Sequence, residues 1–207
     1  MPTDTRARKK PRQARSQIMV ESILESAARV LAEHGYAGAN TNRIAEVAGV
    51  SVGSLYQYFP NKDALITALH ARHSRQMLDV MNTTLARTTG ASLREQIAAL
   101  VHANLSAHLL EPELHQVLEG QFPFYDLPDP SDDDMVQRVR ALLETHRPSI
   151  TPRDLNLATW MVMNMMQALV HACVMEPPRN TSRKRLEAAL TDAIHGYLSY
   201  ADTAPAA

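Results

Sequence analysis

The 207-residue sequence has little glycine and almost no cysteine, and both scarcities narrow the possible folds. It contains seven glycines and a single cysteine, Cys173, which has no partner for an internal disulfide. We therefore expect a reducing compartment, the cytoplasm. Long stretches without glycine or proline carry apolar residues at helical spacing, which predicts an all-α fold.

Long hydrophobic runs and an export signal are also lacking. The basic residues up to Arg15 are not followed by the apolar segment of a signal peptide. The most apolar run, residues 160–175, is interrupted by Asn164, Gln167 and His171 and is shorter than the ~20 residues that a spanning helix needs. We expect no membrane anchor.

Neither sign of charge is in excess over the whole chain, but the charges are unevenly distributed. The part ending at Lys62 has nine basic and five acidic residues, and the remainder has twelve basic and seventeen acidic residues. A basic head on an acidic body indicates a polyanionic partner for the head. Charge alone leaves open the alternative that the basic residues form a solvated, disordered arm.

Start and stop residues divide the chain into nine predicted helices. They are expected at residues 15–34, 41–48, 52–59, 62–88, 93–110 and 112–120, from Ser131 onward, and at residues 151–175 and 182–199. The predicted N-caps are Thr41, Ser51, Ser92 and Ser131, and Thr151-Pro152 predicts the start of the eighth helix.

The segment from Thr41 to Lys62 predicts a helix-turn-helix. Only Gly49-Val50-Ser51 separates its two short helices, and Gly49 can take the left-handed conformation that such a tight turn requires. Leu55 and Phe59 are expected to pack the second helix inward. Short outward side chains would then let this helix lie deep in the major groove of DNA.

The outward positions of the second helix are Ser51, Val52, Ser54 and Gln57. Hydroxyls and an amide can reach base edges, and Val52 can contact a thymine methyl group. Thr41, Tyr56, Tyr58 and Lys62 are expected at the rim, where phosphates are their natural targets. The alternative is that both tyrosines belong to the core.

At these residues the sequence Ile-Ala-Glu-Val-Ala-Gly-Val-Ser-Val-Gly-Ser-Leu-Tyr-Gln-Tyr-Phe-Pro-Asn-Lys resembles the DNA-binding signature of the tetracycline-repressor (TetR) family. The resemblance covers about residues 15–66. It implies a nine-helix, Ω-like homodimer in which the first three helices bind double-stranded DNA and the others bind a ligand and dimerise. It also adds Asn42 and Arg43 to the candidate DNA contacts, although Asn42 is an amide and not a basic residue.

On this basis four regions are predicted. Residues 1–14 form a flexible basic arm, residues 15–62 a helix-turn-helix DNA-binding domain, residues 63–200 a ligand-binding and dimerisation domain, and residues 201–207 a disordered tail.

The eighth predicted helix is apolar nearly all round, so more than one side of it should be covered. One flank is assigned to the dimer interface together with residues of the last helix: Met161, Met165, Ala168, Ala172, Leu190, Ile194 and Tyr197. The opposite flank is assigned to a ligand pocket with companions from other segments: Met77, Met81, Asn104, His108, Phe122, Phe124, Tyr125, Trp160, Asn164, Gln167 and His171. An ordinary core, or a partly wet interface, remains the alternative for the pocket residues.

Catalytic and metal sites are not expected. The nine histidines have no zinc-motif spacing, and no nucleophile with a base or phosphate loop stands out. The sequence therefore predicts a ligand-responsive transcriptional repressor without a cofactor, released from a near-palindromic operator by a small hydrophobic or aromatic effector. The alternatives are a ligand-independent regulator or activator of the same fold and, from another class, an all-helical enzyme or carrier.

Overall fold

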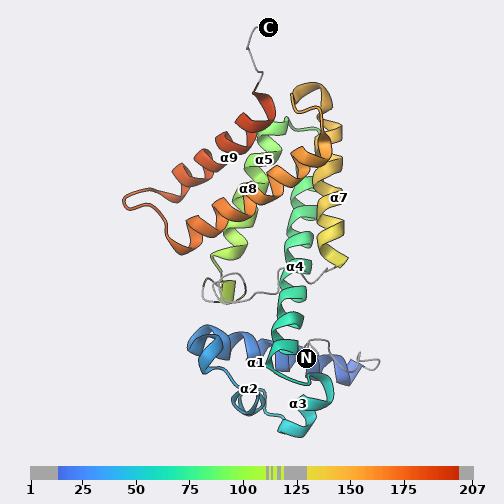
Figure 1. Ribbon diagram of the computed structural model, residues 1–207, viewed down its shortest axis with the longest axis vertical. Coiled ribbons are helices and arrows are strands. Elements are labelled where there is room, and N and C mark those ends of the chain that lie inside the picture. The colour runs from blue at the N-terminus through green and yellow to red at the C-terminus, as the bar shows by residue number, and fades with distance from the viewer. Residues whose placement is uncertain (1–13, 111, 113, 116–117, 119–129, 201–207) are drawn as a thin grey trace. The chain divides into compact units, whose positions relative to one another are not determined.

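The structure of the protein is a computed structural model that describes residues 14–110, 112, 114, 115, 118 and 130–200. These residues contain eight α-helices, one 3-10 turn and no strand, which confirms the all-α prediction (Figure 1). The helices are α1 (Ala14–Gly38), α2 (Thr41–Val47), α3 (Val52–Tyr58), α4 (Lys62–Arg87), α5 (Leu93–His108), α7 (Pro130–Thr145), α8 (Leu155–Met175) and α9 (Arg183–Ser199). Most of the helix predicted at 112–120 lies outside the described residues, as does the loop with Phe122, Phe124 and Tyr125.

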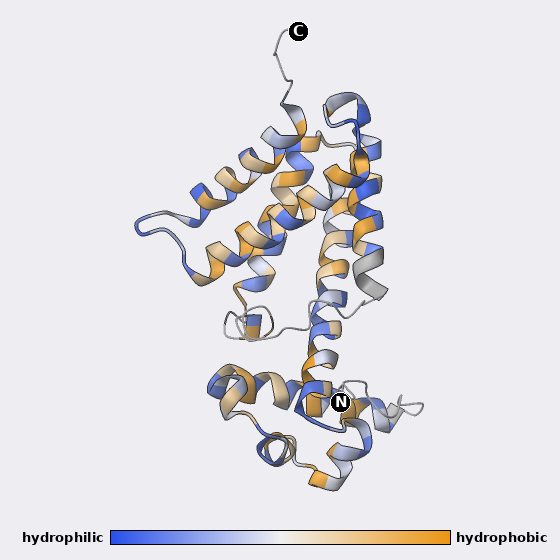
Figure 2. Cartoon of the chain, viewed as in Figure 1, coloured by the Kyte–Doolittle hydropathy of each residue, from blue (hydrophilic) through white to orange (hydrophobic). Residues whose placement is uncertain are grey.

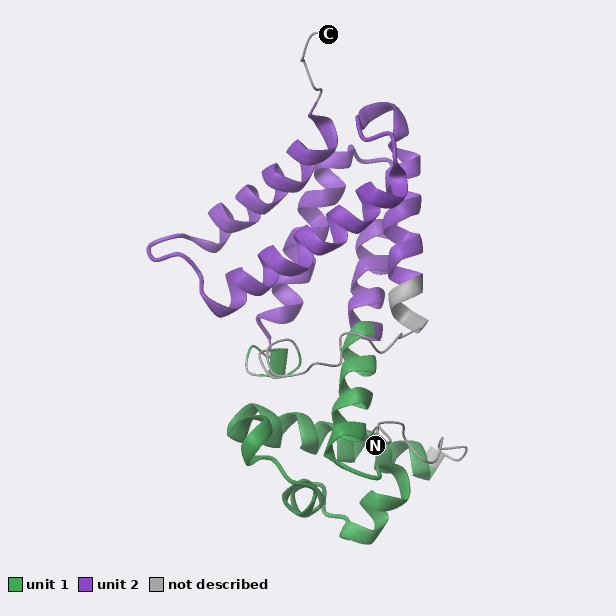
Figure 3. Ribbon diagram, in the orientation of Figure 1, with its two compact units in different colours: residues 1–74, 111–128 green, residues 75–110, 129–207 purple. Residues whose placement is uncertain are grey.

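The chain divides into two compact units (Figure 3). The first unit comprises residues 1–74 and 111–128, and the second comprises residues 75–110 and 129–207. Helix α4 begins in the first unit and ends in the second, so the division falls inside this helix and not at its first residue.

The first unit has a core built by α1, α2, α3 and the start of α4. Ile23, Leu31, Ile44, Leu55 and Leu65 are fully buried in it. Apolar residues at helical spacing put one face of each helix inward, as the sequence predicts.

Helix α1 is interrupted where the sequence predicts its end. Gly35 has φ +62° and ψ −179°, a conformation open essentially to glycine alone. Helical structure continues after this break to Gly38, four residues beyond the predicted end at His34.

The N-caps show which start signals were correctly interpreted. Ser51 caps α3 and Ser92 caps α5, as predicted. In the structure Ser92 also forms a capping box with Glu95. The Thr41 prediction is wrong by one residue, because the Asn40 side chain accepts the bond from Arg43 N and is the N-cap of α2.

The predicted start of the eighth helix at Thr151-Pro152 is also wrong. Helix α8 begins at Leu155, and the Asp154 carboxylate caps it by accepting from Asn156 N and Leu157 N at 2.9 and 3.1 Å. The Thr151 hydroxyl instead donates to Tyr200 O at 2.6 Å. It therefore ties the segment before α8 to the end of α9.

In the second unit, α5, α8 and α9 lie side by side and α7 packs against α8. Val101, Leu143, Ala158, Ile194 and Leu198 are at most 1% exposed at the centre of this core.

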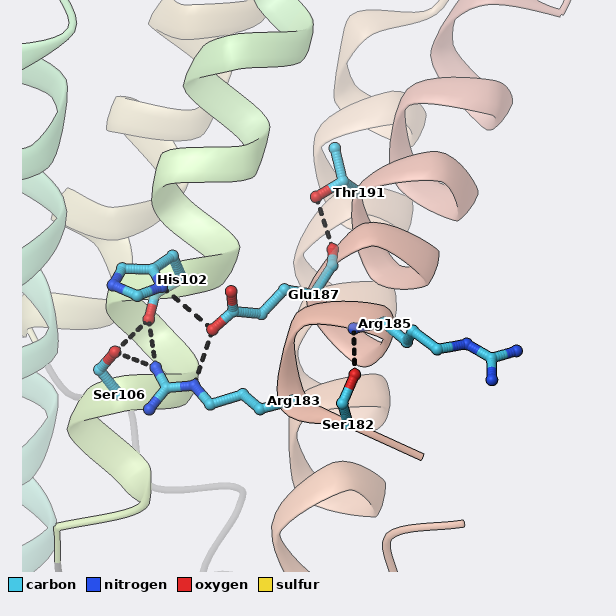
Figure 4. A network of polar contacts seen from close by, with 7 residues as sticks. All are labelled: His102, Ser106, Ser182, Arg183, Arg185, Glu187 and Thr191. Atoms are coloured by element: carbon cyan, nitrogen blue, oxygen red, sulfur yellow. Dashed lines mark hydrogen bonds and ion pairs between the residues drawn. The ribbon is translucent and has the colours of Figure 1, made fainter. Parts of the chain in front are cut away.

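A polar network joins α5 to α9 at the surface of the second unit (Figure 4). His102 Nδ1 lies 3.0 Å from Glu187 Oε1, and Arg183 Nε donates to the same oxygen at 2.7 Å. Arg183 also donates to Ser106 Oγ. Burial alone would raise the pKa of Glu187, but the hydrogen bonds from Arg183 and His102 outweigh it and hold that pKa below its usual value.

The most apolar run of the sequence lies within helix α8. This helix has 21 residues and, among the described helices, is the one whose length and composition would allow a span. Figure 2 shows apolar residues along most of its length. Only 28% of its most apolar stretch is buried inside the protein. The exposed side of this helix carries Leu157, Trp160, Ala168 and Ala172 beside polar residues: Asn156, Asn164 and Gln167.

Candidate nucleic-acid interface

The turn between α2 and α3 is as tight as the sequence predicts. Gly49 has φ +66°, the left-handed conformation that its missing Cβ allows. Gly49 N donates to Glu46 O at 3.1 Å, and Val50 N donates to Ala45 O at 3.0 Å. These bonds end α2 and fix the direction in which α3 starts.

Helix α3 packs by one side and exposes the other. Leu55 and Phe59 are 0% and 1% exposed, which confirms their predicted core positions. Val52 and Tyr56 are 37% and 39% exposed, and Gln57 is exposed as well. The outward side of α3 is therefore free of the protein core over its whole length.

The two serines at the start of α3 are already hydrogen-bonded to each other. Ser54 N donates to Ser51 Oγ at 3.0 Å, and the two hydroxyl oxygens lie 2.8 Å apart. One hydroxyl hydrogen serves this pair, so one of the two hydroxyls keeps a hydrogen for an outside acceptor.

Helix α2 places its first residues beside α3. The Thr41 and Tyr56 hydroxyl oxygens are 3.0 Å apart, which links the start of α2 to the middle of α3. Asn42 and Arg43 are exposed. Arg43 is the only lysine or arginine within the described α2 and α3 helices, and Glu46 is their only acid.

Tyr58 does not occupy the predicted rim position. Its side chain is 6% exposed and belongs to the core of the first unit. The alternative prediction, that the tyrosines are core residues, is therefore correct for Tyr58. The helical period of about 3.6 residues explains why Tyr58 is buried and Tyr56 is exposed. Tyr58 falls on the inner side of α3 with Leu55 and Phe59, whereas Tyr56 falls on the outer side.

Lys62 has partners inside the protein. Its Nζ donates to Tyr36 O at 2.6 Å and to Ala39 O at 3.1 Å, and it lies 3.6 Å from the centroid of the Tyr36 ring. The sequence analysis predicts that Lys62 lies at the rim of the helix-turn-helix and binds phosphate, and it does not predict these contacts.

The two flanks of α8 are arranged differently from the prediction. Trp160 is 60% exposed, and Asn164 and Gln167 are exposed, so these predicted pocket residues lie on the open side of the helix. Of the predicted dimer residues, Ala168 and Ala172 are exposed as well. The uncovered surface of α8 therefore combines members of both predicted flanks.

Other predicted residues of the body lie inside the second unit. Leu190 and Ile194, assigned to the dimer interface, are 5% and 0% exposed, so that assignment is wrong for both. They belong to the core because α9 turns this side toward α5 and α8. The remaining candidates are partly or fully buried: Met77, Met81, Asn104, His108, Met161, Met165, His171 and Tyr197.

Two histidines of the first unit meet although their spacing gives no motif. His73 and His115 have ring centroids 6.4 Å apart, with the rings tilted by 50°, and His115 is 4% exposed. Spacing along the chain could not reveal this pair, because residues far apart in sequence are brought together only by the fold.

Two family models match the chain. The model described as "Bacterial regulatory proteins, tetR family" matches residues 23–69, which include α2 and α3. The model described as "Tetracyclin repressor-like, C-terminal domain" matches residues 92–198.

Curated relatives match only part of the chain. The transcriptional repressor AcnR of Corynebacterium glutamicum is 39% identical over 62 residues, which cover 30% of this chain and 33% of that protein. The fatty acid metabolism regulator protein of Bacillus subtilis is 30% identical over 84 residues, which cover 41% of this chain and 42% of that protein. The chain thus aligns with less than half of either relative's length.

Solved structures share the fold of most of the chain. FadR from Bacillus halodurans, a fatty acid degradation regulator, has a TM-score of 0.72 and 22% identity, with 94% of this chain and 99% of that chain covered. FadR from Bacillus subtilis in complex with stearoyl-CoA also has a TM-score of 0.72, with 20% identity and coverage of 86% and 98%.

Proposed function

Because this chain belongs to the tetracycline-repressor family, we propose that it is a homodimeric transcriptional repressor that binds a near-palindromic DNA operator through α2 and α3. A small hydrophobic effector bound in the second unit releases it. It acts in the cytoplasm as a binding protein and not as an enzyme.

The exposed side of α3 is the observation that carries the proposal. Val52, Tyr56 and Gln57 stand outward on a helix whose other side is fixed in the core by Leu55 and Phe59. A rigid helix with short outward side chains at its start fits the major groove, where the Gln57 amide can pair with a base edge. In this arrangement Asn42, Arg43, Ser51, Ser54 and the linked Thr41–Tyr56 hydroxyls face the same duplex.

The uncovered surface of α8 supports a second copy of the chain as partner. Leu157 and Trp160 are 54% and 60% exposed, and large exposed patches of this kind mark interaction sites. On α9, the space beside the Cα of Gly196 is open, and Ala189 and Ala193 are also exposed, so another helix can approach closely. A symmetric dimer would place two recognition helices on successive major grooves, about 34–36 Å apart.

The effector is proposed to be a long acyl chain or a thioester of one. The Bacillus subtilis neighbour binds stearoyl-CoA, and the interior of this second unit has partly buried methionines, including Met81, Met163 and Met166. Flexible thioether side chains adapt to apolar ligands of varied shape. Such a ligand can weaken DNA binding only if it prefers the conformation in which the two recognition helices are mis-spaced.

Selection of bound duplexes from a random-sequence library tests DNA recognition directly. We expect an enriched near-palindrome whose half-sites are separated by one helical turn. Failure of the dimer to retard any duplex at low salt would reject the proposal and favour a carrier or an enzyme.

Trp160→Glu tests the dimer. A buried charge at the centre of the interface should convert the dimer to a monomer in sedimentation experiments, since it would be desolvated without a partner. Ile18→Glu, at a 71% exposed position of α1, is the matched control and should remain dimeric. A dimer that persists in the Trp160 variant would place the interface elsewhere.

The effector is tested by adding stearoyl-CoA, free stearate or coenzyme A to the complex of the protein with the selected duplex. Release by stearoyl-CoA or stearate, but not by coenzyme A alone, supports an acyl-chain pocket. Release by none of the three excludes this ligand class.

A further inference from the structure

The ammonium group of Lys62 joins the two ends of the helix-turn-helix. Its donor contacts to Tyr36 O and Ala39 O reach back 26 and 23 residues along the chain. Ala39 directly precedes Asn40, the N-cap of α2, and Lys62 is the first residue of α4. The whole α2–turn–α3 segment therefore lies between two points that a single side chain holds together.

The Tyr36 side chain reinforces this connection from the other side. Its ring lies under the Lys62 ammonium, and its hydroxyl donates to Asp63 Oδ1 at 2.8 Å. Partial burial and the Asp63 carboxylate raise the pKa of Tyr36, so the hydroxyl keeps the proton it donates. Lys62, Tyr36 and Asp63 form a cluster, which we call the α1–α4 clamp.

The clamp supplies hydrogen-bond donors at the end of α1. Helix α1 ends at Gly38, so the carbonyl of Tyr36 lies in its last turn, where carbonyl groups lack intrahelical donors, and Ala39 directly follows the helix. A lysine ammonium close to these carbonyls supplies donors and positive charge where the helix dipole is negative. A cation over a tyrosine ring is attracted by the ring face as well.

A lysine held in this way is poorly placed to neutralise a phosphate. To contact DNA, its ammonium would have to leave two carbonyls and an aromatic ring inside the protein. Within the described α2 and α3, Arg43 is exposed and carries the only basic side chain, so it is the direct candidate for a phosphate contact.

We infer that Lys62 is a positioning residue for DNA recognition, which fixes α2 and α3 through the α1–α4 clamp and does not bind the phosphate backbone. The inference rests on the proposed function and assigns the residue's role within it.

Salt dependence separates the two roles, because each lost phosphate contact lowers the slope of log affinity against log salt by about 1. The variants are Lys62→Met, which keeps the aliphatic stem, Lys62→Arg, which keeps the charge, and Tyr36→Phe. Arg43→Gln is the matched control. Each is measured for thermal unfolding and for binding to the duplex selected by the unchanged protein, over a range of salt concentrations.

For Lys62→Met we expect a melting temperature lower by about 3 °C or more, affinity reduced about tenfold, and an unchanged salt slope. Lys62→Arg should also melt lower, since a planar guanidinium does not fit the same two carbonyls, and Tyr36→Phe should show a smaller decrease. Arg43→Gln should keep its melting temperature and lose about one unit of slope.

Two results would overturn the inference. One is a slope reduced by about 1 in Lys62→Met with an unchanged melting temperature; the other is full stability and affinity in Lys62→Arg. If the unchanged protein selects no duplex, the proposed function fails, but the melting temperatures still decide whether the clamp exists.

Discussion

The two units of this chain differ in how well the position of a residue, in the core or on the surface, can be predicted from the sequence around it. In the first unit, one short segment contains the turn glycine, the Ser51 cap and the inward Leu55, and the structure has all three where the sequence predicts them. In the second unit, helical periodicity and the family resemblance together predict the roles of the two flanks of α8 and of α9, yet Leu190 and Ile194 are buried in the core and Trp160 is exposed.

The difference shows where local pattern is sufficient. A helix-turn-helix is specified by contacts between residues close in sequence, so tight spacing leaves few conformations. A helix that is apolar all round carries no information on which side meets its own unit and which meets a partner. Periodicity identifies such a helix but does not orient it.

Truncation of one core leucine or isoleucine in each unit should have the largest effects. Leu55→Ala and Ile194→Ala both remove a side chain that is 0% exposed, and each should lower the free energy of unfolding by roughly 2–5 kcal/mol. Urea denaturation measures the loss. A loss below about 1 kcal/mol in Ile194→Ala would contradict the core position of Ile194, because it would indicate that this side chain lies at the surface.

Replacement of Gln57 should change sequence preference and not general affinity. Gln57→Ala should reduce discrimination at one position of each half-site by about 1–3 kcal/mol, while Arg43→Gln weakens binding to every duplex alike. Repeated selection with each variant provides the measurement. Equal weakening on all duplexes by Gln57→Ala would remove this residue from base recognition.

Loss of a helix cap should cost about 1 kcal/mol in either unit. Ser51→Ala removes the cap of α3, which the sequence identified, and Asp154→Ala removes the cap of α8, which it did not. Asp154→Asn keeps a side-chain oxygen and should retain most of the stability. If Asp154→Ala were as stable as the unchanged protein, α8 would not depend on this residue to begin.

Acid should weaken the α5–α9 network by a smaller amount. The folded-state pKa of Glu187 lies below its ordinary value of 4.5, so the stabilisation it provides is complete above that pH and is lost as the pH falls through the folded pKa. Surface pairs of this kind contribute about 0.2–1 kcal/mol. Glu187→Gln should remove this part of the acid dependence of unfolding, and an unchanged dependence would show that the network does not stabilise the second unit.

Most of the fold could be predicted because helix boundaries depend on nearby residues. The N-caps Ser51 and Ser92 and the end of α8 at Met175 were all found from local signals. Thr151-Pro152 misled the prediction because its hydroxyl has a partner 49 residues away, at Tyr200, which no local rule reveals. The roles of Tyr58 and Lys62 escaped for the same reason, since their partners come from α1 and the core.

The sequence by itself determined the helical class, the tight turn at Gly49 and the family signature, because each of these depends on residues within a few turns of one another. Tertiary structure decided which side of α8 remains uncovered, where the ammonium of Lys62 rests, and that His73 lies beside His115. These facts depend on contacts between segments that are distant in the chain, and such contacts exist only once the helices have packed.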